Sequence, residues 1–250
     1  MEVHHHPQLE HKPKPWKEYL LEGVMIFLAV TMGFFAESLR EHLADRDRET
    51  QYMHVMVIDL QKDSVQINNE IAYTNHDLVE LDSLFKCLHS SKLTDSVQVK
   101  LYQLNMQAGY LVGFDFSDAA SVQLKNTGGL RLIQNQDVTD AIIQYWETRD
   151  DVKFNMGVFN QNVQNFWDDG LKIFDMYDIK NLRHPGDKGV GFEIEPDARL
   201  LTRDKMQLIE YANRVGGLLV ALKVHYLTSI LRQRTIEADL ERLINKNYKF

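Results

Sequence analysis

The stretch GVMIFLAVTMGFFA at residues 23–36 decides how this chain is organised, because none of its 14 residues carries a charge. Extended to Tyr19 and Leu39, the segment reaches a helical length of about 31 Å, which matches a hydrocarbon core of about 30 Å. Trp16 and Tyr19 lie where interfacial aromatic residues occur. A buried helix of a soluble core is the alternative, but no other segment offers enough apolar surface to cover it. We therefore predict one transmembrane helix over residues 17–40.

The residues after the apolar stretch distinguish an anchor from a cleaved signal peptide. Phe34 stands where a signal peptidase needs a small residue before Ala36, and the chain then continues in helix-forming residues. Lysine and arginine are equally numerous on the two sides, so the positive-inside rule does not decide the orientation. A short tail before a first span favours an uncleaved signal anchor with its N-terminus inside the cell, and we expect the large domain on the other side of the membrane.

The composition limits the partners and the fold class. The chain of 250 residues contains only 5 prolines and 13 glycines, which favours long helices over a many-turned β fold. A net charge of −8 without a basic block argues against nucleic acid as a partner. Cys87 is the single cysteine, which excludes an intramolecular disulfide framework and a thiolate zinc cluster.

A heptad pattern of apolar residues follows the predicted span. Its eleven positions, separated by steps of four and three residues, hold nine apolar side chains. The positions are Met53, Val57, Leu60, Ser64, Ile67, Ile71, Thr74, Leu78, Leu81, Phe85 and Leu88. Neither proline nor glycine occurs between Gly33 and Gly109, so we expect one helix from about Pro15 to Ser90. This helix would leave the bilayer as a stalk and enter a helical bundle.

Turn and capping signals divide the rest of the chain into shorter helices. We expect helices over residues 95–112, 118–125, 138–175 and 202–244, with a glycine turn at 126–129. The apolar side of the third of these helices would include Ile142, Trp146, Phe154, Val158, Val163 and Phe166. One long loop covers residues 175–197, where GVGFEIE favours a short strand. The apolar stretch at residues 215–222 is too short for a second span and is expected in the core.

The sequence thus predicts an all-α fold in which a single N-terminal transmembrane helix continues into a long-helix bundle domain. The expected parts are a polar tail (1–16), the transmembrane helix (17–40), a coiled-coil-like stalk (41–92) and the bundle domain (93–250).

Two segments resemble a known family. EYLLEGVMIFLAVTMGFFAESLREHLADRDRE at residues 18–49 is similar to the opening of a family of uncharacterised bacterial single-span membrane proteins with an α-helical domain. SVQLKNTGGLRLIQNQDVTDAIIQYW at residues 121–146 is similar to the second recurring segment of that family. The resemblance implies a bacterial protein with a membrane-anchored helical domain. Together with the expected orientation, we predict a protein of the bacterial inner (cytoplasmic) membrane with its helical domain in the periplasm. The resemblance brings no known activity, cofactor or catalytic residue.

Small residues recur on one face of the predicted span. Ala29, Gly33 and Ala36 follow one another at steps of four and three, a spacing that lets membrane helices approach closely. Glu22 lies seven residues before Ala29 on nearly the same face, and Glu37 lies near the other end of the span. Coincidence is the alternative, because Gly and Ala are common in membrane helices. In the lipid bilayer this face favours a homo-oligomer or a contact with another membrane protein.

The loop at residues 175–197 concentrates side chains that could bind a cation or a partner. Its candidate ligand residues are Asp178, His184, Asp187, Glu193 and Glu195. Their spacing is too scattered for a calcium loop, which needs closely spaced oxygens around a tight glycine turn. We therefore assign no metal site and no cofactor to the chain.

Three further patterns have simple structural explanations. The His4–His6 tract lies in a tail without the rigid geometry of a metal site. The pairs His76 and Glu80, and Asp59 and Asp63, have i, i+4 spacing but lie outside the apolar seam, so we expect them on a solvated surface. The aromatic residues that recur at helical spacing are expected in the core; they are Tyr145, Trp146, Phe159, Phe166, Trp167, Phe174 and Tyr177.

No nucleophile, base and orienting group can be assembled from the sequence, and no catalytic motif occurs in it, so we do not expect an enzyme. The favoured hypothesis is a membrane-anchored helical protein that acts through protein–protein contacts, as a scaffold, an oligomeric assembly or a sensor ectodomain. The alternative is an oligomeric ion- or proton-conducting assembly that uses Glu22, since carboxylates inside membranes often mark ion pathways.

Overall fold

The computed structural model describes residues 15–90, 92–113, 115–182 and 191–250. These residues form α-helices and one short hairpin, which confirms the all-α prediction. The chain divides into two compact units, Met1–Glu49 and Thr50–Phe250. In chain order the elements are α1 (Trp16–Ser90), α2 (Asp95–Gln107), α3 (Ala119–Asn126), the 3-10 helix η1 (Gly129–Leu132), α4 (Gln136–Gly170), the 3-10 helix η2 (Met176–Asp178), β1 (Ile179–Leu182), β2 (Gly191–Ile194), α5 (Lys205–Val220), the π-helix η3 (Ala221–Tyr226) and α6 (Leu227–Asn247).

Two helix ends and one helix interior differ from the predictions. α2 ends at Gln107 rather than near residue 112, because the chain becomes extended at Ala108 and Gly109 adopts a positive φ of 74°. α4 ends at Gly170 rather than near residue 175. The C-terminal helix contains the π-helical turn η3, which the sequence did not reveal. The short strand predicted in the long loop is present as β2, which pairs antiparallel with β1.

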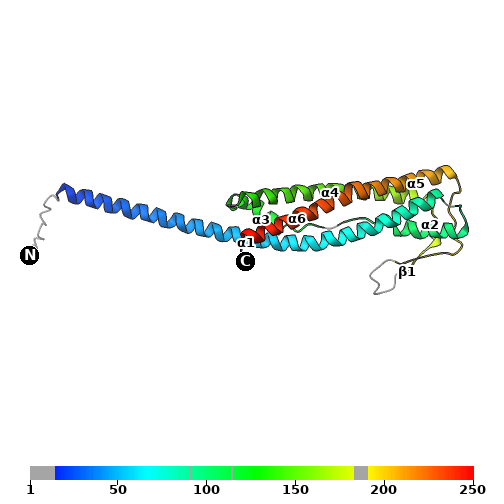
Figure 1. Cartoon of the computed structure of the whole chain (residues 1–250), viewed down its shortest axis with the longest axis horizontal. Helices are drawn as coiled ribbons and strands as arrows, with labels where there is room; N and C mark the ends of the chain where they lie inside the picture. The colour runs from blue at the N-terminus through cyan, green and yellow to red at the C-terminus, as the bar shows by residue number, and fades with distance from the viewer. Residues whose placement is uncertain (1–14, 91, 114, 183–190) are drawn as a thin grey trace, which may run out of the picture. The chain divides into compact units, whose positions relative to one another are not determined.

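Three long rods form the second unit: residues 50–90 of α1, then α4, then α5, η3 and α6 in line (Figure 1). Tyr226 donates a hydrogen bond to Glu70 (2.8 Å), and Gln61 donates one to Glu241 (3.2 Å). The C-terminal rod therefore runs antiparallel to α1.

α4, in contrast, runs parallel to α1. Near one end Tyr145 of α4 donates a hydrogen bond to Asp63 of α1 (2.5 Å). Further along both helices, Trp167 of α4 donates to the carbonyl oxygen of Gly109, and Asp77 of α1 accepts from the N–H of the same glycine. Parallel neighbours require the chain to return along the bundle between them. α2 begins this return, and residues 108–113 and 115–118, together named the crossover segment, continue it towards α3 (Figure 1).

Side chains of α1 and α4 satisfy the backbone of the crossover segment. Backbone groups buried without a partner are costly, and this non-helical segment has no ladder to supply one. Side-chain atoms at 2.7–3.1 Å take that role; the pairs are Gly109 N–H with Asp77, Gly109 C=O with Trp167, Val112 N–H and C=O with Asn160, Asp115 C=O with Gln66, Ser117 N–H with Asp63 and Ser117 C=O with Arg149. Asp59 then accepts from Ala120 N–H (2.7 Å) in the first turn of α3, where a negative charge is favourable.

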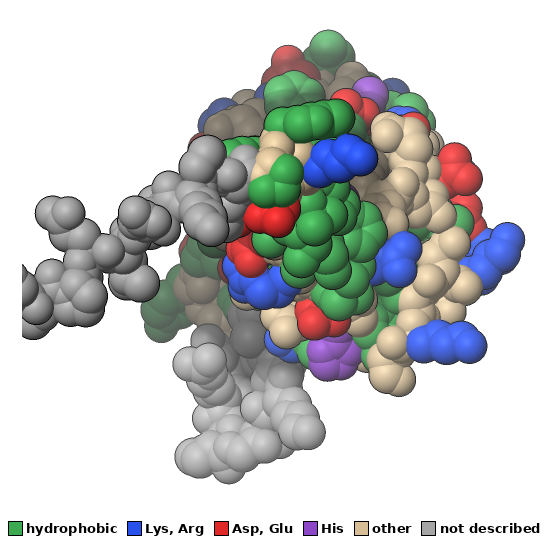
Figure 2. All heavy atoms as spheres, turned by 90° about the vertical axis from the view of Figure 1, so that its left-hand side faces the viewer, with side chains coloured by type: hydrophobic (Ala, Val, Ile, Leu, Met, Phe, Trp, Pro, Cys, Tyr) green, Lys and Arg blue, Asp and Glu red, His purple; other side chains and the backbone are tan. Residues whose placement is uncertain are grey.

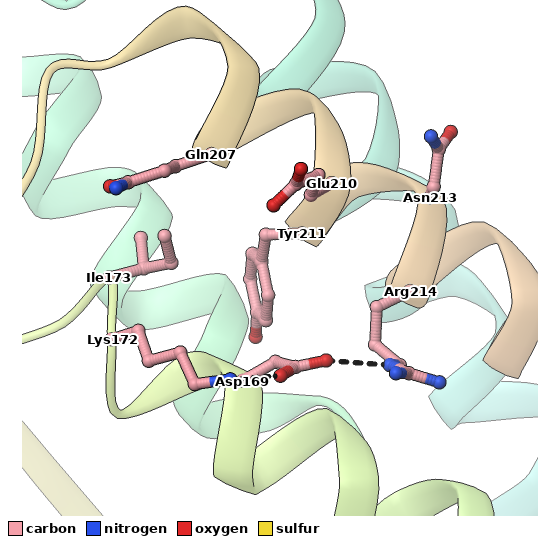
Figure 3. A pocket seen from close by; sticks show the side chains of 8 residues that line it. All are labelled: Asp169, Lys172, Ile173, Gln207, Glu210, Tyr211, Asn213 and Arg214. Carbon is pink, nitrogen blue, oxygen red and sulfur yellow. Dashed lines mark hydrogen bonds and ion pairs between the residues drawn. The ribbon is translucent and has the colours of Figure 1, made fainter.

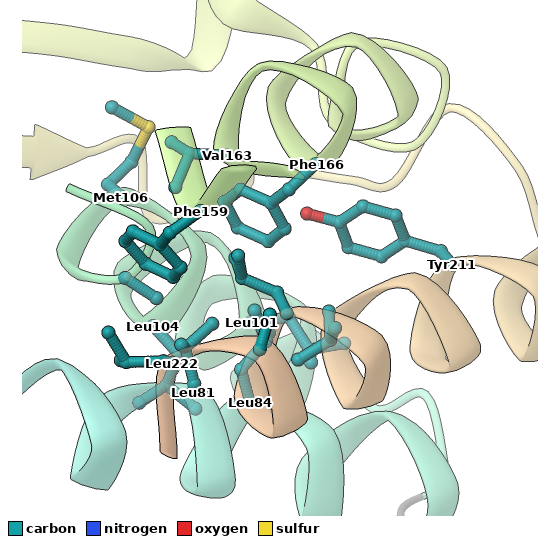
Figure 4. Close-up of a cluster of buried hydrophobic side chains, with 14 of the residues drawn as sticks. Leu81, Leu84, Leu101, Leu104, Met106, Phe159, Val163, Phe166, Tyr211 and Leu222 are labelled. Carbon is teal, nitrogen blue, oxygen red and sulfur yellow. The ribbon is translucent and has the colours of Figure 1, made fainter. Parts of the chain in front are cut away.

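The core of the second unit consists of two hydrophobic clusters. The larger contains Leu81 and Leu84 of α1 with Phe159 and Phe166 of α4, and Tyr211 stacks on Phe166 with ring centroids 5.7 Å apart (Figure 4). The smaller surrounds Met53, Met56 and Leu60 of α1 and is completed by α3, α4 and α6. Every position of the predicted heptad seam is buried or half-buried, so the seam faces the interior as expected.

Several side-chain predictions were wrong. Asp59 and Asp63 are buried rather than solvated, because the crossover segment and α3 need their oxygens as acceptors. Phe154 and Val158, expected on the apolar side of α4, are exposed, because the partners of α4 lie on its other faces. Tyr177, expected in the core, is 89% exposed on the short helix η2.

We expect the Gly109→Ala variant to be less stable than the wild type. A Cβ at this position would lie 2.6 Å from Cε1 of Phe166, and the positive φ disfavours any other residue. Strain and overpacking together should lower the free energy of unfolding by about 2–4 kcal/mol, measured as a lower melting temperature. Gly157→Ala is the matched control: Gly157 lies inside α4 with no neighbour within 4 Å, and alanine should stabilise by about 0.5–1 kcal/mol. Equal melting temperatures for the two variants would contradict the assigned role of Gly109.

Candidate functional site

Acidic side chains repeat every seven residues along α1. Asp63, Glu70 and Asp77 are 0%, 7% and 3% exposed, and each lies one position before a residue of the apolar seam. Each accepts a hydrogen bond from another element: Asp63 from Ser117 N–H and Tyr145, Glu70 from Tyr226, and Asp77 from Gly109 N–H. These carboxylates therefore line the inner side of α1, where solvated acids would not be expected.

A hollow of about 500 Å³ opens beside the last two of these acids, between α1 and the crossover segment. We name it the acidic hollow; its lining residues are Glu70, Tyr73, Thr74, His76, Asp77, Tyr110, Leu111, Val112 and Gly113. Oδ1 of Asp77 accepts from Gly109 N–H at 2.8 Å. The second oxygen of Asp77 and the hydroxyl of Thr74 are buried and have no hydrogen-bond partner among the described residues.

Burial sets the electrostatics of the acidic hollow. It raises the pKa of Asp77 to about 6, against the opposing effect of the hydrogen bond from Gly109. It also raises the pKa of Glu70, although the hydrogen bond from Tyr226 opposes this shift. Burial, together with the nearby carboxylates of Asp77 and Glu80, raises the pKa of Tyr110. The hollow is thus an electronegative site whose charged forms are poorly solvated, and a cation or a hydrogen-bond donor would stabilise them.

A larger hollow of about 700 Å³ lies where α4 meets α5, and three of its charged side chains are paired with one another (Figure 3). Asp169 accepts from Lys172 Nζ and from Arg214 Nε, both at 2.8 Å, and these two cations lower its pKa. Tyr211 at the back of the hollow donates to Asn105. The two cations therefore occupy Asp169, and its ion pair with Arg214 links α4 to α5.

A buried polar layer separates the two hydrophobic clusters. On α1 it contains Asp63 and Ser64, which lie between the last residue of the smaller cluster and the first of the larger one. Thr148 and Arg149 occupy the same place on α4, and Gln233 and Glu237 on α6. The layer members are Asp63, Ser64, Tyr145, Thr148, Arg149, Gln233 and Glu237. Polar groups at this depth favour one alignment of the three rods, because any shift along the axis would place them against apolar side chains.

Glu237 of the polar layer is only 2% exposed, and burial raises its pKa to about 8. A hydrogen bond from Ser64 opposes this shift, whereas the neighbouring charge of Asp63 adds to it. Glu237 is therefore largely protonated at neutral pH in the folded protein. One of its oxygens and both polar atoms of Gln233 have no hydrogen-bond partner in the described part of the chain.

The residues singled out in the predicted span all lie on α1 in the first unit. Ala29, Gly33 and Ala36 are exposed, and a Cβ built on Gly33 would meet nothing within 4 Å. Glu22 is exposed at the N-terminal side of the stripe, and Glu37 accepts hydrogen bonds from Arg40 one helical turn further on.

The structure distributes the predicted ligand residues of the 175–197 loop over different environments. Asp178 accepts from Arg199 N–H (3.2 Å) and lies 3.3 Å from the hydroxyl of Tyr102, so it fixes the base of the hairpin. Glu195 forms an ion pair with Lys180, and Glu193 is exposed. His184 and Asp187 lie outside the described residues, as does the histidine tract of the tail.

One sequence pattern could have predicted the buried acids beside the acidic hollow. Acids at residues 63, 70 and 77 share the heptad period of the seam beside them, which places them on the inner edge of the helix rather than on its outer face. Thr74 was identified only as a seam position. Comparisons of the chain with protein-family models, curated proteins and solved structures find no match. The family resemblance of residues 18–49 and 121–146 therefore stays a prediction.

We expect stability to fall as the pH rises from about 5 to 8, and Glu237→Gln to remove part of this fall. The folded protein keeps a proton on Glu237 that the unfolded chain releases above its ordinary pKa of 4.5, so ionisation opposes folding. Glutamine keeps the neutral shape, so the variant should be more stable than the wild type at pH 8 by about 2–4 kcal/mol and nearly equal at pH 5. Thermal melts at both pH values test this, with the exposed Glu147→Gln as control. Parallel pH profiles for wild type and Glu237→Gln would contradict the assignment.

Proposed function

We propose that this protein is a non-enzymatic, membrane-anchored helical protein whose extracytoplasmic domain acts through contacts with other proteins. One observation carries the proposal: every residue from 15 to 43 is exposed, although this part of α1 contains the most apolar sequence of the chain. Large side chains such as Ile26, Phe27 and Phe34 are 66–74% exposed. Figure 2 looks at the molecule from the N-terminal side and shows hydrophobic side chains gathered at the centre of the view. In water such a surface would be unstable, whereas in lipid it is the expected outer surface of a spanning helix.

Among the residues that the structure describes, two helical stretches are long and apolar enough to cross a membrane. One lies in Trp16–His89, near the N-terminus, and its most apolar window is entirely unburied. The other lies in Lys205–Asn247, where Val215, Leu218 and Leu222 are buried in the core of the second unit. The contrast in burial favours a single anchor at the N-terminus, with the second stretch serving as a core helix.

Several polar side chains of the second unit hold its own elements together, which supports a contact function at its surface. Asp59 and Asp63 bind backbone N–H groups, and Asp169 is held by two cations. Phe154, Val220 and Val224 are exposed apolar side chains around two hollows of α4, α5, η3 and α6, and they offer apolar surface to a partner protein. We propose the bacterial inner membrane as the location, with this unit in the periplasm, which follows the family resemblance and the expected signal-anchor orientation.

The small-residue face of the anchor supports a homo-oligomer as the working assembly. In lipid, apolar side chains gain little by leaving the acyl chains, so association depends on close backbone packing and shared polar contacts. Ala29, Gly33 and Ala36 point within about 60° of one another around the helix axis, and Glu22 lies on the same face. Glu22 turned towards a second copy would avoid the acyl chains.

We expect the pair Leu28→Arg and Val30→Arg to prevent stable membrane insertion. Arginine near the middle of a span costs about 2.5–3.5 kcal/mol per residue, so most of the protein should leave the pellet when membranes of expressing bacteria are washed with alkaline carbonate. The control pair Val65→Arg and Val79→Arg changes equally exposed residues of the second unit and should stay in the pellet. Release of the wild type by the same wash would contradict the anchor.

We expect Gly33→Leu to weaken self-association in nanodiscs, because leucine holds the helix backbones apart. Gly23→Leu is the matched control, since Gly23 is equally free of neighbours but lies roughly 110° around the helix from the centre of the face formed by Ala29, Gly33 and Ala36. Native mass measurement of the intact assemblies should show a loss of oligomer for the first variant alone. A monomeric wild type, or equal effects of both variants, would remove this face and with it the conduction hypothesis that needs several copies of Glu22.

A further inference from the structure

The acidic hollow contains hydrogen-bonding groups that the fold leaves unused. Thr74 is 1% exposed and Asp77 is 3% exposed, and each has a side-chain oxygen without a partner among the residues that the structure describes. Buried polar atoms in native proteins are nearly always paired, so an orphaned atom that lines a hollow points to a partner from outside the chain. Two such atoms, one helical turn apart, line the same hollow.

The spacing of the acceptors suits a donor with several N–H groups. Glu70, Thr74 and Asp77 follow one another at i, i+4 and i+7 and therefore share one face of α1. Asp77 uses one oxygen for Gly109, and Glu70 uses one for Tyr226, which leaves one oxygen on each carboxylate. An ammonium group carries three N–H donors and no acceptor, so it matches a set of three acceptors.

The charge of the hollow also favours a cation. Two carboxylates line it, and neither lysine nor arginine occurs among its described lining residues. The side chain of the lining residue His76 is 66% exposed and lies 3.9 Å from Glu80, an acid whose charge acts on Asp77. A metal ion is a poorer fit, because no group of three or more His, Cys, Asp or Glu in the described ranges could hold one.

The rest of the wall is apolar and aromatic. Tyr73, Tyr110 and Leu111 are 72%, 50% and 57% exposed, so they form an open rim over the buried acceptors. Tyrosine rings attract cations through their faces, and their apolar bodies cover aliphatic or aromatic groups. The volume of about 500 Å³ lies within the range of small-molecule sites.

We propose that the acidic hollow binds an organic ammonium ion, a primary amine on a small apolar or aromatic body. The ammonium group bonds the free oxygens of Thr74, Asp77 and Glu70, and the body packs on Tyr73, Tyr110 and Leu111. This site goes beyond the proposed anchoring and contact function and does not depend on it, since all its residues belong to the second unit.

The test uses the full chain in nanodiscs and calorimetric titration with 2-phenylethylamine at pH 7.5. The matched ligand is 2-phenylethanol, which has the same body but a neutral hydroxyl. We expect one amine site per chain and binding at least tenfold weaker for the alcohol. Asp77→Asn keeps the acceptor for Gly109 but loses the charge, and it should weaken amine binding at least tenfold. Asp82→Asn, on the outer side of α1, should leave the affinity unchanged.

Thr74→Val keeps the shape of the side chain and removes only the hydroxyl, so it should weaken amine binding severalfold. This variant provides the test if Asp77→Asn does not fold. Far-UV circular dichroism melts report on folding. The proposal is overturned if the wild type takes up no amine at millimolar concentration, or if Asp77→Asn folds and binds as well as the wild type. Equal binding of the alcohol, or displacement of the amine by calcium at lower concentration, would also overturn it.

Discussion

The second unit depends on a single constraint: a non-helical return segment is packed along a helical bundle, and its backbone must find partners there. α1 and α4 are parallel, so the chain has to travel back between them before α4 begins. A helix or a sheet would satisfy its own backbone hydrogen bonds, but the described residues of the crossover segment form neither. Each buried N–H or C=O without a partner would cost about 1–3 kcal/mol, and Asp63, Asp77 and Asn160 remove this cost directly.

The same constraint explains why the inner edge of α1 is acidic. Carboxylates only accept, which suits a segment that presents N–H groups, and charge-assisted bonds are stronger than neutral ones. Burial nevertheless leaves the charged forms poorly solvated, so the pKa of Asp77 rises to about 6 and that of Glu237 to about 8. In the acidic hollow, Glu70 and Asp77 each use one carboxylate oxygen for a hydrogen bond within the fold. The other oxygen of each remains as an acceptor for a ligand.

The sequence predicted those features that follow from periodicity alone. The apolar seam, the single long helix α1 and the all-α class each rest on patterns of many residues, so one exception such as Thr74 does not disturb them. It could not predict the burial of Asp59 and Asp63, because their partners are backbone N–H groups more than fifty residues away, and every sequence has such groups. The prediction that Phe154 and Val158 face the core was wrong for the opposite reason. Both residues match the helical period of α4, but no neighbouring element lies over that face.

The kind of side chain that is exposed differs between the two ends of α1. Over residues 15–43 the side chains that face outwards are mostly apolar, whereas from residue 50 onwards the buried positions include Asp59, Asp63, Glu70 and Asp77. A single rule, apolar inside and polar outside, cannot describe both parts in one solvent. Under the proposed anchor, each part instead fits its own solvent: lipid around the first part, where the outer surface should be apolar, and water around the second, where acids are buried only when the fold supplies donors. The apolar surface of the first unit and the donor-supported acids inside the second therefore both support the proposed membrane anchor.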